Sequence, residues 1–100
     1  MWLRLRYAGA CGVITGKQRE SINLPRGTTI GGLLDKLSAK YGSYFANRIL
    51  NHNKSGLRAS CRLFIGQEDV SQMSLDTPIR RVEGGDTDVT LYFLVGAAGG

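Results

Sequence analysis

The hydrophobic period of this chain changes at Thr29, and this change limits its possible folds more than any other feature. Apolar residues alternate with polar ones before Thr29 and follow a helical spacing after it. Thr29 can cap the start of this helix, and Gly42 follows its end. A helix with one apolar stripe, in a chain of 100 residues, must bury that stripe against a sheet. The stripe consists of Ile30, Leu33, Leu34, Leu37 and Tyr41.

Alternating patterns predict strands on both sides of this helix. Residues 3–7 alternate Leu and Tyr with arginine, which gives one apolar and one wet face, and residues 20–24 alternate again. We expect these two segments to form an antiparallel pair joined by a long, glycine-containing loop. Residues 61–65 and 89–95 predict two further strands, of which the last is the most apolar.

The order of these elements predicts the topology. A crossover through the helix allows the first and last strands to pair in parallel at the centre of the sheet. The sequence therefore predicts an α+β fold of the β-grasp, or ubiquitin-like, type: a mixed four- to five-stranded sheet packed on one main helix. We expect the domain to span residues 1–95 and a flexible tail to span residues 96–100. The other expected elements are a short helix over 43–50, with Tyr44, Phe45 and Ile49 as its apolar members, and turns at 75–79 and 83–86.

Composition excludes several classes of protein. With 42% hydrophobic and 21% charged residues, the chain is not of the disordered class. No apolar run approaches the ~20 residues of a membrane span, and the alternating start lacks the apolar centre of a signal peptide. We therefore expect a cytoplasmic protein without membrane contact. The two cysteines, Cys11 and Cys61, have neither disulfide-framework nor metal-ligand spacing, so we expect no metal and inert thiols.

The net charge of +5 is unevenly distributed along the chain. Residues 1–66 carry +9 and residues 67–100 carry −4. This asymmetry fits an acidic partner surface, a nucleic acid, or simply the solvated faces of one fold. No aromatic signature typical of RNA-binding domains accompanies the basic residues, so nucleic acid is not an expected partner. The arginines that could gather on one face are Arg4, Arg6, Arg26, Arg58 and Arg62.

The sequence ends in Gly96-Ala97-Ala98-Gly99-Gly100, which contains no side chain large enough to pack. Glycine has no Cβ, so such residues can thread a narrow channel. A terminal carboxylate on this arm can reach into a partner's active site. Adenylation by ATP there would make it an acyl donor for a sulfur or nitrogen nucleophile. A frayed terminus without a function is the alternative.

The chain resembles the MoaD/ThiS sulfur-carrier family, which includes the archaeal small modifier proteins and the ubiquitin-related modifier. The features that carry the resemblance are the order of elements, the apolar final strand, and the motifs Leu75-Asp76-Thr77-Pro78-Ile79, Gly85-Asp86 and Gly99-Gly100. The resemblance implies a chain that is not itself an enzyme and binds no cofactor. It implies that a ubiquitin-activator-like enzyme uses ATP to adenylate Gly100, and that a sulfur donor then forms a thiocarboxylate.

Within the MoaD branch, the resemblance implies the small subunit of molybdopterin synthase, whose tail inserts into the large subunit during molybdenum cofactor biosynthesis. Two alternatives stay open. One is a ubiquitin-like modifier conjugated through Gly100 to lysines of target proteins, and the other is a β-grasp binding module with an inert tail.

We also expect Leu94, Tyr92 and Phe64 to form an exposed apolar partner-binding patch on the sheet face opposite the helix.

Overall fold

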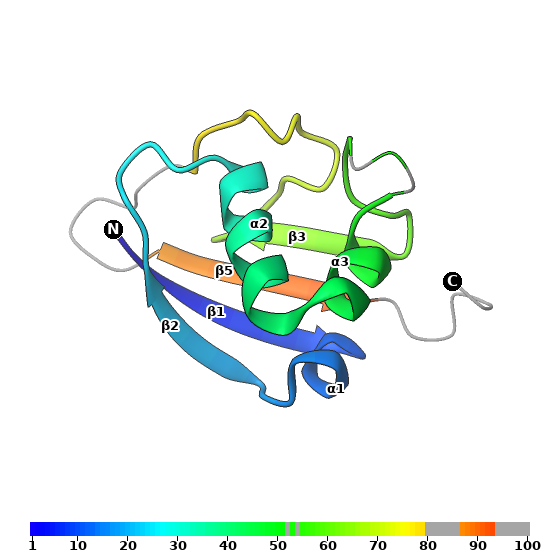
Figure 1. Ribbon diagram of the computed structural model, residues 1–100. Coiled ribbons are helices and arrows are strands. Elements are labelled where there is room, and N and C mark those ends of the chain that lie inside the picture. Colours follow the sequence, from blue (N-terminus) through cyan, green and yellow to red (C-terminus); the bar gives the residue numbers. More distant parts are fainter. Residues whose placement is uncertain (52, 54, 80–86, 94–100) are drawn as a thin grey trace.

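The computed structural model describes residues 1–51, 53, 55–79 and 87–93, the last range by its backbone. A five-stranded mixed sheet carries two helices on one face, with a third, short helix at its end (Figure 1). The elements in chain order are β1 (Trp2–Gly9), α1 (Cys11–Thr15), β2 (Arg19–Asn23), α2 (Ile30–Tyr41), α3 (Ser43–Ile49), β3 (Cys61–Ile65), β4 (Glu68–Asp69) and β5 (Thr87–Phe93).

The sheet has the strand order β2-β1-β5-β3-β4, with β5 between β1 and β3. The parallel pairing of β1 with β5 confirms the crossover expected from the sequence. The β1–β2 and β3–β5 pairs are antiparallel. Leu5 lies beside Val89, and Leu63 lies beside Leu91, so the predicted apolar strands do meet at the centre of the sheet. The last strand begins at Thr87, two residues earlier than predicted.

Helix α2 covers the sheet with the predicted stripe. Ile30, Leu33, Leu34 and Leu37 are each 1% exposed, and the Tyr41 side chain is half-buried. The Thr29 hydroxyl accepts a hydrogen bond from the Gly32 amide at 3.0 Å, as expected of an N-cap. The helix ends at Gly42, whose φ of 89° favours glycine.

The turn at residues 75–79 is confirmed, and it holds the start of α2. The Gly31 amide donates to the Leu75 carbonyl at 2.8 Å, and the Ile30 amide donates to the Thr77 carbonyl at 2.9 Å. A Cβ at Gly31 would lie 3.0 Å from the Leu75 carbonyl oxygen. Glycine in the first helical turn lowers helix propensity, but this close approach of the Leu75 carbonyl favours it.

One local expectation was wrong, and the apolar residues of α3 differ in exposure. The segment between β1 and β2 is not only a loop, because it contains α1, which buries Cys11 and ends at Gly16 with φ of 76°. Helix α3 buries Phe45 and Ile49 as predicted, but Tyr44 is 59% exposed because it lies on the outer side of that helix. The turn predicted at 83–86 lies outside the described residues.

Candidate functional site

The structure describes the predicted partner patch in part and does not describe the predicted tail. Gly96, Ala97, Ala98, Gly99 and Gly100 lie outside the described residues, and so does Leu94. Tyr92 belongs to β5, which is described by its backbone alone, and lies in register between Ala8 and Arg62. Only Phe64 can therefore be examined as a side chain.

The end of β5 is fixed by strands on both sides. Phe93 lies in register with Gly9, at the end of β1, and with Cys61, at the start of β3. The Cys61 thiol lies 3.5 Å from the Arg48 carbonyl, which joins this edge of the sheet to α3. The last described residue of β5 is thus paired on both sides at this end of the sheet.

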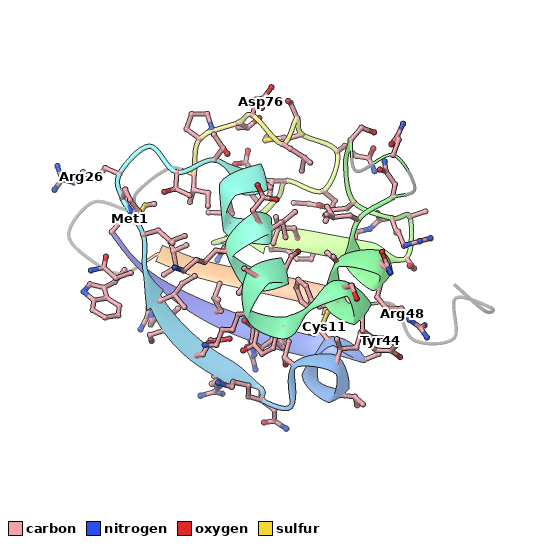
Figure 2. The ribbon with its side chains drawn as sticks, viewed as in Figure 1. Met1, Cys11, Arg26, Tyr44, Arg48 and Asp76 are labelled. Carbon is pink, nitrogen blue, oxygen red and sulfur yellow. The ribbon has the colours of Figure 1, made fainter. Side chains whose placement is uncertain are left out.

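Exposed side chains of the two short helices, α1 and α3, flank this end of the sheet. Val13 of α1 is 85% exposed, and Tyr44 of α3 is 59% exposed. The Arg48 guanidinium lies 4.9 Å from the centre of the Tyr44 ring, within the range of a cation–π contact. Figure 2 shows Tyr44 and Arg48 near this end of the molecule, and Met1 and Arg26 at the opposite end.

The open face of the sheet, opposite α2 and α3, carries arginines beside Phe64. Phe64 is half-buried and is not packed against the described core, which agrees with its predicted place on this face. The register runs from Phe64 through Thr90 to Arg6 and then Arg19. Arg4 and Arg6 are exposed on β1, as the alternating pattern predicted. The described part of this face is therefore more cationic than apolar.

Two adjoining hollows follow this face along β1 and β2. One, of about 590 Å³, is lined by residues that include Arg4, Arg6, Arg19 and Ser21. The other, of about 620 Å³, is also bordered by Arg6 and Arg19, and it reaches Gly9. Because Gly9 is the register partner of Phe93, the second hollow extends to the end of the sheet at which β5 ends.

Both cysteines are buried, as their predicted inertness requires. Burial raises the pKa of the Cys11 thiol to about 12, with a smaller contribution from nearby Cys61. Burial likewise raises the pKa of the Cys61 thiol to about 11. Neither residue forms a disulfide. A thiol with such a pKa stays protonated at neutral pH, so these groups are poor nucleophiles and poor metal ligands.

The sequence analysis missed a polar cluster under the end of α2. Glu20 of β2 is 8% exposed in its side chain and accepts hydrogen bonds from the Tyr7 hydroxyl at 2.5 Å, from the Tyr41 hydroxyl and from the Lys40 ammonium. Lys17 lies 3.9 Å from the same carboxylate. The sequence does contain a signal for this buried position. Glu20 lies two residues before Ile22 and four before Leu24, so in an alternating strand its side chain faces the same side as these apolar residues.

The charge of this Glu20 cluster is set by its hydrogen bonds. Burial by itself would raise the pKa of Glu20, but the bonds from Lys40, Tyr41 and Tyr7 outweigh it and lower that pKa. Burial, followed by the bond to Glu20, raises the pKa of both Tyr7 and Tyr41. The cluster therefore holds an ionised carboxylate between two protonated phenols. It joins β1, β2 and α2, and we assign it a structural role.

The described residues offer neither a metal site of the usual ligands nor a membrane-spanning helix. In that part of the chain, no three His, Cys, Asp or Glu side chains are grouped as they would be to hold a metal ion. No helix there is long and apolar enough to cross a membrane.

Comparison with known proteins identifies the fold through solved structures alone. No family model matches the sequence, and no curated protein matches it. Small archaeal modifier protein 1 from Haloferax volcanii superposes with a TM-score of 0.75 at 12% identity, covering 96% of this chain and 98% of that one. A protein assigned as molybdopterin converting factor subunit 1 from Pyrococcus furiosus superposes with a TM-score of 0.71 at 15% identity, covering 95% and 99%.

A third similar structure is a chain of the BexX/CysO complex from Amycolatopsis orientalis. Its TM-score is 0.66 at 17% identity, covering 93% of this chain and 96% of that one. These likenesses establish the predicted α+β, ubiquitin-like β-grasp fold. The structural neighbours are also of the kinds that the sequence resemblance named, namely archaeal modifiers and a molybdopterin-related subunit.

Proposed function

We propose that this chain is a ubiquitin-like sulfur carrier whose Gly100 carboxylate is adenylated and then converted to a thiocarboxylate. The acceptor we propose is the large subunit of molybdopterin synthase, with this chain as the small subunit. The observation that carries the proposal is the position of β5, held between two strands and ending at the edge beside Gly9 and Cys61. The likeness to molybdopterin converting factor subunit 1 supports the proposed acceptor.

The proposed chemistry takes place in partner enzymes. A carboxylate oxygen of Gly100 attacks the α-phosphorus of ATP, which forms an acyl-adenylate and releases pyrophosphate. A hydrosulfide-level sulfur donor then attacks the acyl carbon and expels AMP, leaving the thiocarboxylate. Gly96, Ala97, Ala98 and Gly99 would thread the channel to that site because they carry no large side chain. The protein contributes the acyl group and a recognition surface, and it acts as a substrate and not as a catalyst.

A modifier function is the second proposal, and the likeness to small archaeal modifier protein 1 favours it. In that case the amine of a target lysine attacks the same acyl-adenylate, and AMP leaves as an isopeptide bond forms and the amine loses a proton. Both functions need an activating enzyme. The neighbouring BexX/CysO complex supports a protein partner for this chain in general, without identifying it. The two functions differ only in the nucleophile.

The partner-binding role of Phe64, Tyr92 and Leu94 is part of this proposal. Phe64 is half-buried on the open face, where contact with a partner would bury the rest of its ring. Replacing Phe64 by Ser should weaken binding to the activating enzyme without unfolding the protein, because this ring is not packed against the described core. Normal activation of the folded variant would remove Phe64 from the proposed interface.

The experiment that tests the function is the intact mass of the protein isolated from the cells that produce it. We expect a fraction whose mass is raised by one exchange of oxygen for sulfur, and the loss of that fraction in a Gly100 deletion. Asp76→Asn, which changes an exposed residue of the turn beside α2, is the control and should retain the modified fraction. Conjugates linked through Gly100 to lysines would instead establish the modifier. An unmodified mass without conjugates would refute both proposals and favour the binding module with an inert tail.

A further inference from the structure

Two arginines on the open face are placed where their charges repel each other. Arg6 of β1 and Arg19 of β2 lie directly opposite in the antiparallel register, and both are exposed. Like charges in this position destabilise a pair of strands. Among the residues that the structure describes, no carboxylate forms an ion pair with either guanidinium, since Glu20 points to the helix side and pairs with lysines. Among the described side chains, none offsets the repulsion within this pair.

The same two arginines border both hollows of the open face. We call the two hollows together the arginine groove: it runs from Ser21 past Arg6 and Arg19 to Gly9, at the edge where β5 ends. A ligand lying along the groove would thus contact both guanidinium groups and also reach the point from which the C-terminal residues continue.

The opposite side of this face carries negative charge. The cross-sheet row that begins with Arg19 and Arg6 passes Thr90 and Phe64 and ends at the exposed Asp69 of β4. Hydrogen bonds from the Ser71 side chain and amide, and the nearby Arg62, hold the pKa of Asp69 below its usual range. Arg6 and Arg19 therefore lie at one side of this face, whereas the other side holds the carboxylate of Asp69 near Arg62. A protein surface with acidic residues opposite Arg6 and Arg19 alone would match this distribution better than a uniform polyanion that crosses the whole sheet.

We propose that the arginine groove docks an acidic segment of the enzyme that modifies the C-terminus. Guanidinium groups bind carboxylates through paired hydrogen bonds, and two of them side by side suit a segment that carries two acidic residues. The continuity of the groove with the end of β5 favours this enzyme over other acidic proteins, because it must hold the domain while the tail lies in its active site. The inference rests on the proposed function for the identity of the partner, and on the groove alone for its acidic chemistry.

The first test needs no enzyme. Isotope-labelled protein is titrated with a synthetic hexaglutamate peptide at low salt and observed by NMR. We expect the side-chain signals of Arg6 and Arg19 to shift, and the shifts to disappear in Arg19→Glu but to persist in Arg26→Glu. Arg26 is an exposed arginine at the opposite end of the molecule (Figure 2), so the control changes the net charge equally. Arg19→Glu should melt at or above the wild-type temperature, because it places opposite charges across the strands.

The second test uses a ubiquitin-activator-like adenylating enzyme that activates the wild-type chain, followed by carrier-dependent exchange of pyrophosphate into ATP. We expect Arg19→Glu to raise the KM for the carrier on the order of tenfold, with kcat unchanged and a weaker dependence of KM on salt. Arg26→Glu should leave all three values near wild type. A KM equal to that of the control would overturn the inference while leaving the proposed function intact.

The remaining outcomes distinguish a failure of the groove inference from a failure of the proposed function. Failure of hexaglutamate to shift the groove arginines would overturn the inference whatever the fate of the proposed function. A chain that no activating enzyme uses would refute the proposed function, and the peptide titration would still decide on the groove. A wild-type dimer that Arg19→Glu dissociates would assign the groove to a second copy. Preferential binding of a single-stranded oligonucleotide through the same arginines would assign it to nucleic acid.

Discussion

Removing the buried carboxylate of the Glu20 cluster should destabilise the protein by an amount that the structure allows us to work out. Glu20→Gln keeps the size of the side chain and removes its charge. Hydrogen bonds to a charged group contribute about 1.5–3 kcal/mol each, and the phenols of Tyr7 and Tyr41 both donate to this carboxylate. The amide can still accept one of these bonds, and it is cheaper to bury than an ion. The expected net loss is about 2 kcal/mol of the free energy of unfolding.

This loss corresponds to a fall of roughly 8–16 °C in Tm for a domain of this size. It should be measured by thermal and urea unfolding at neutral pH. Glu68→Gln, which changes an exposed residue of β4, is the matched control and should stay within about 0.5 kcal/mol of wild type. Tyr41→Phe should show a smaller loss that is not additive with that of Glu20→Gln, because the two residues share one hydrogen bond.

The pH dependence gives an independent check on the same cluster. The pKa of Glu20 is lower in the folded state than its ordinary value of 4.5, so the unfolded chain takes up a proton more readily. The contribution of Glu20 is therefore fully present above about pH 4.5 and is lost as the pH falls through the lowered, folded-state pKa. Because Glu20→Gln lacks this contribution, the stability gap between it and wild type should narrow in acid. A Tm equal to that of the wild type, or a gap that is constant with pH, would refute the reasoning.

Three further predictions concern packing and the cysteines. Phe45→Ala should cost about 3–5 kcal/mol in urea unfolding, because this ring is fully buried, whereas Tyr44→Ala on the outer side of the same helix should cost about 0.5 kcal/mol or less. Gly31→Ala should lower stability by about 1 kcal/mol or more despite its higher helix propensity, because the new Cβ would lie 3.0 Å from a backbone oxygen; a stabilised variant would contradict this. Cys11 and Cys61 should react with a thiol reagent only at the rate of unfolding, and rapid labelling of the native protein at neutral pH would show that a thiol is accessible.

Much of the fold could be predicted because its signals are local. The stripe on α2, the Thr29 cap and the alternation in β1 each depend on residues within a few positions of one another, and all three are confirmed. The turn at 75–79 was also predicted, but its role was not. The advantage of glycine at position 31 comes from Leu75, a residue more than forty positions away, and no local pattern encodes such an approach.

The candidate site was only partly predictable for the same reason. The structure places Phe64 on the open face, as predicted. Both cysteines are buried, and the inertness of their thiols stays a prediction. Helix α1 was missed because it is five residues long and contains a glycine, too short for a hydrophobic period to show. The role of Gly100 and its tail stays a prediction from the sequence.

The sequence by itself determined the order of the four longer strands and of helices α2 and α3, the apolar centre of the sheet and the small-residue end of the chain. Each of these is a property of neighbouring residues and of the period at which apolar side chains recur. Only the tertiary structure placed Arg6 opposite Arg19 and joined Glu20 to Tyr7 and Tyr41. Those arrangements depend on the register between strands and on the position at which α2 crosses the sheet. Register and crossing are fixed by the packing of the whole core, which no segment of the sequence specifies alone.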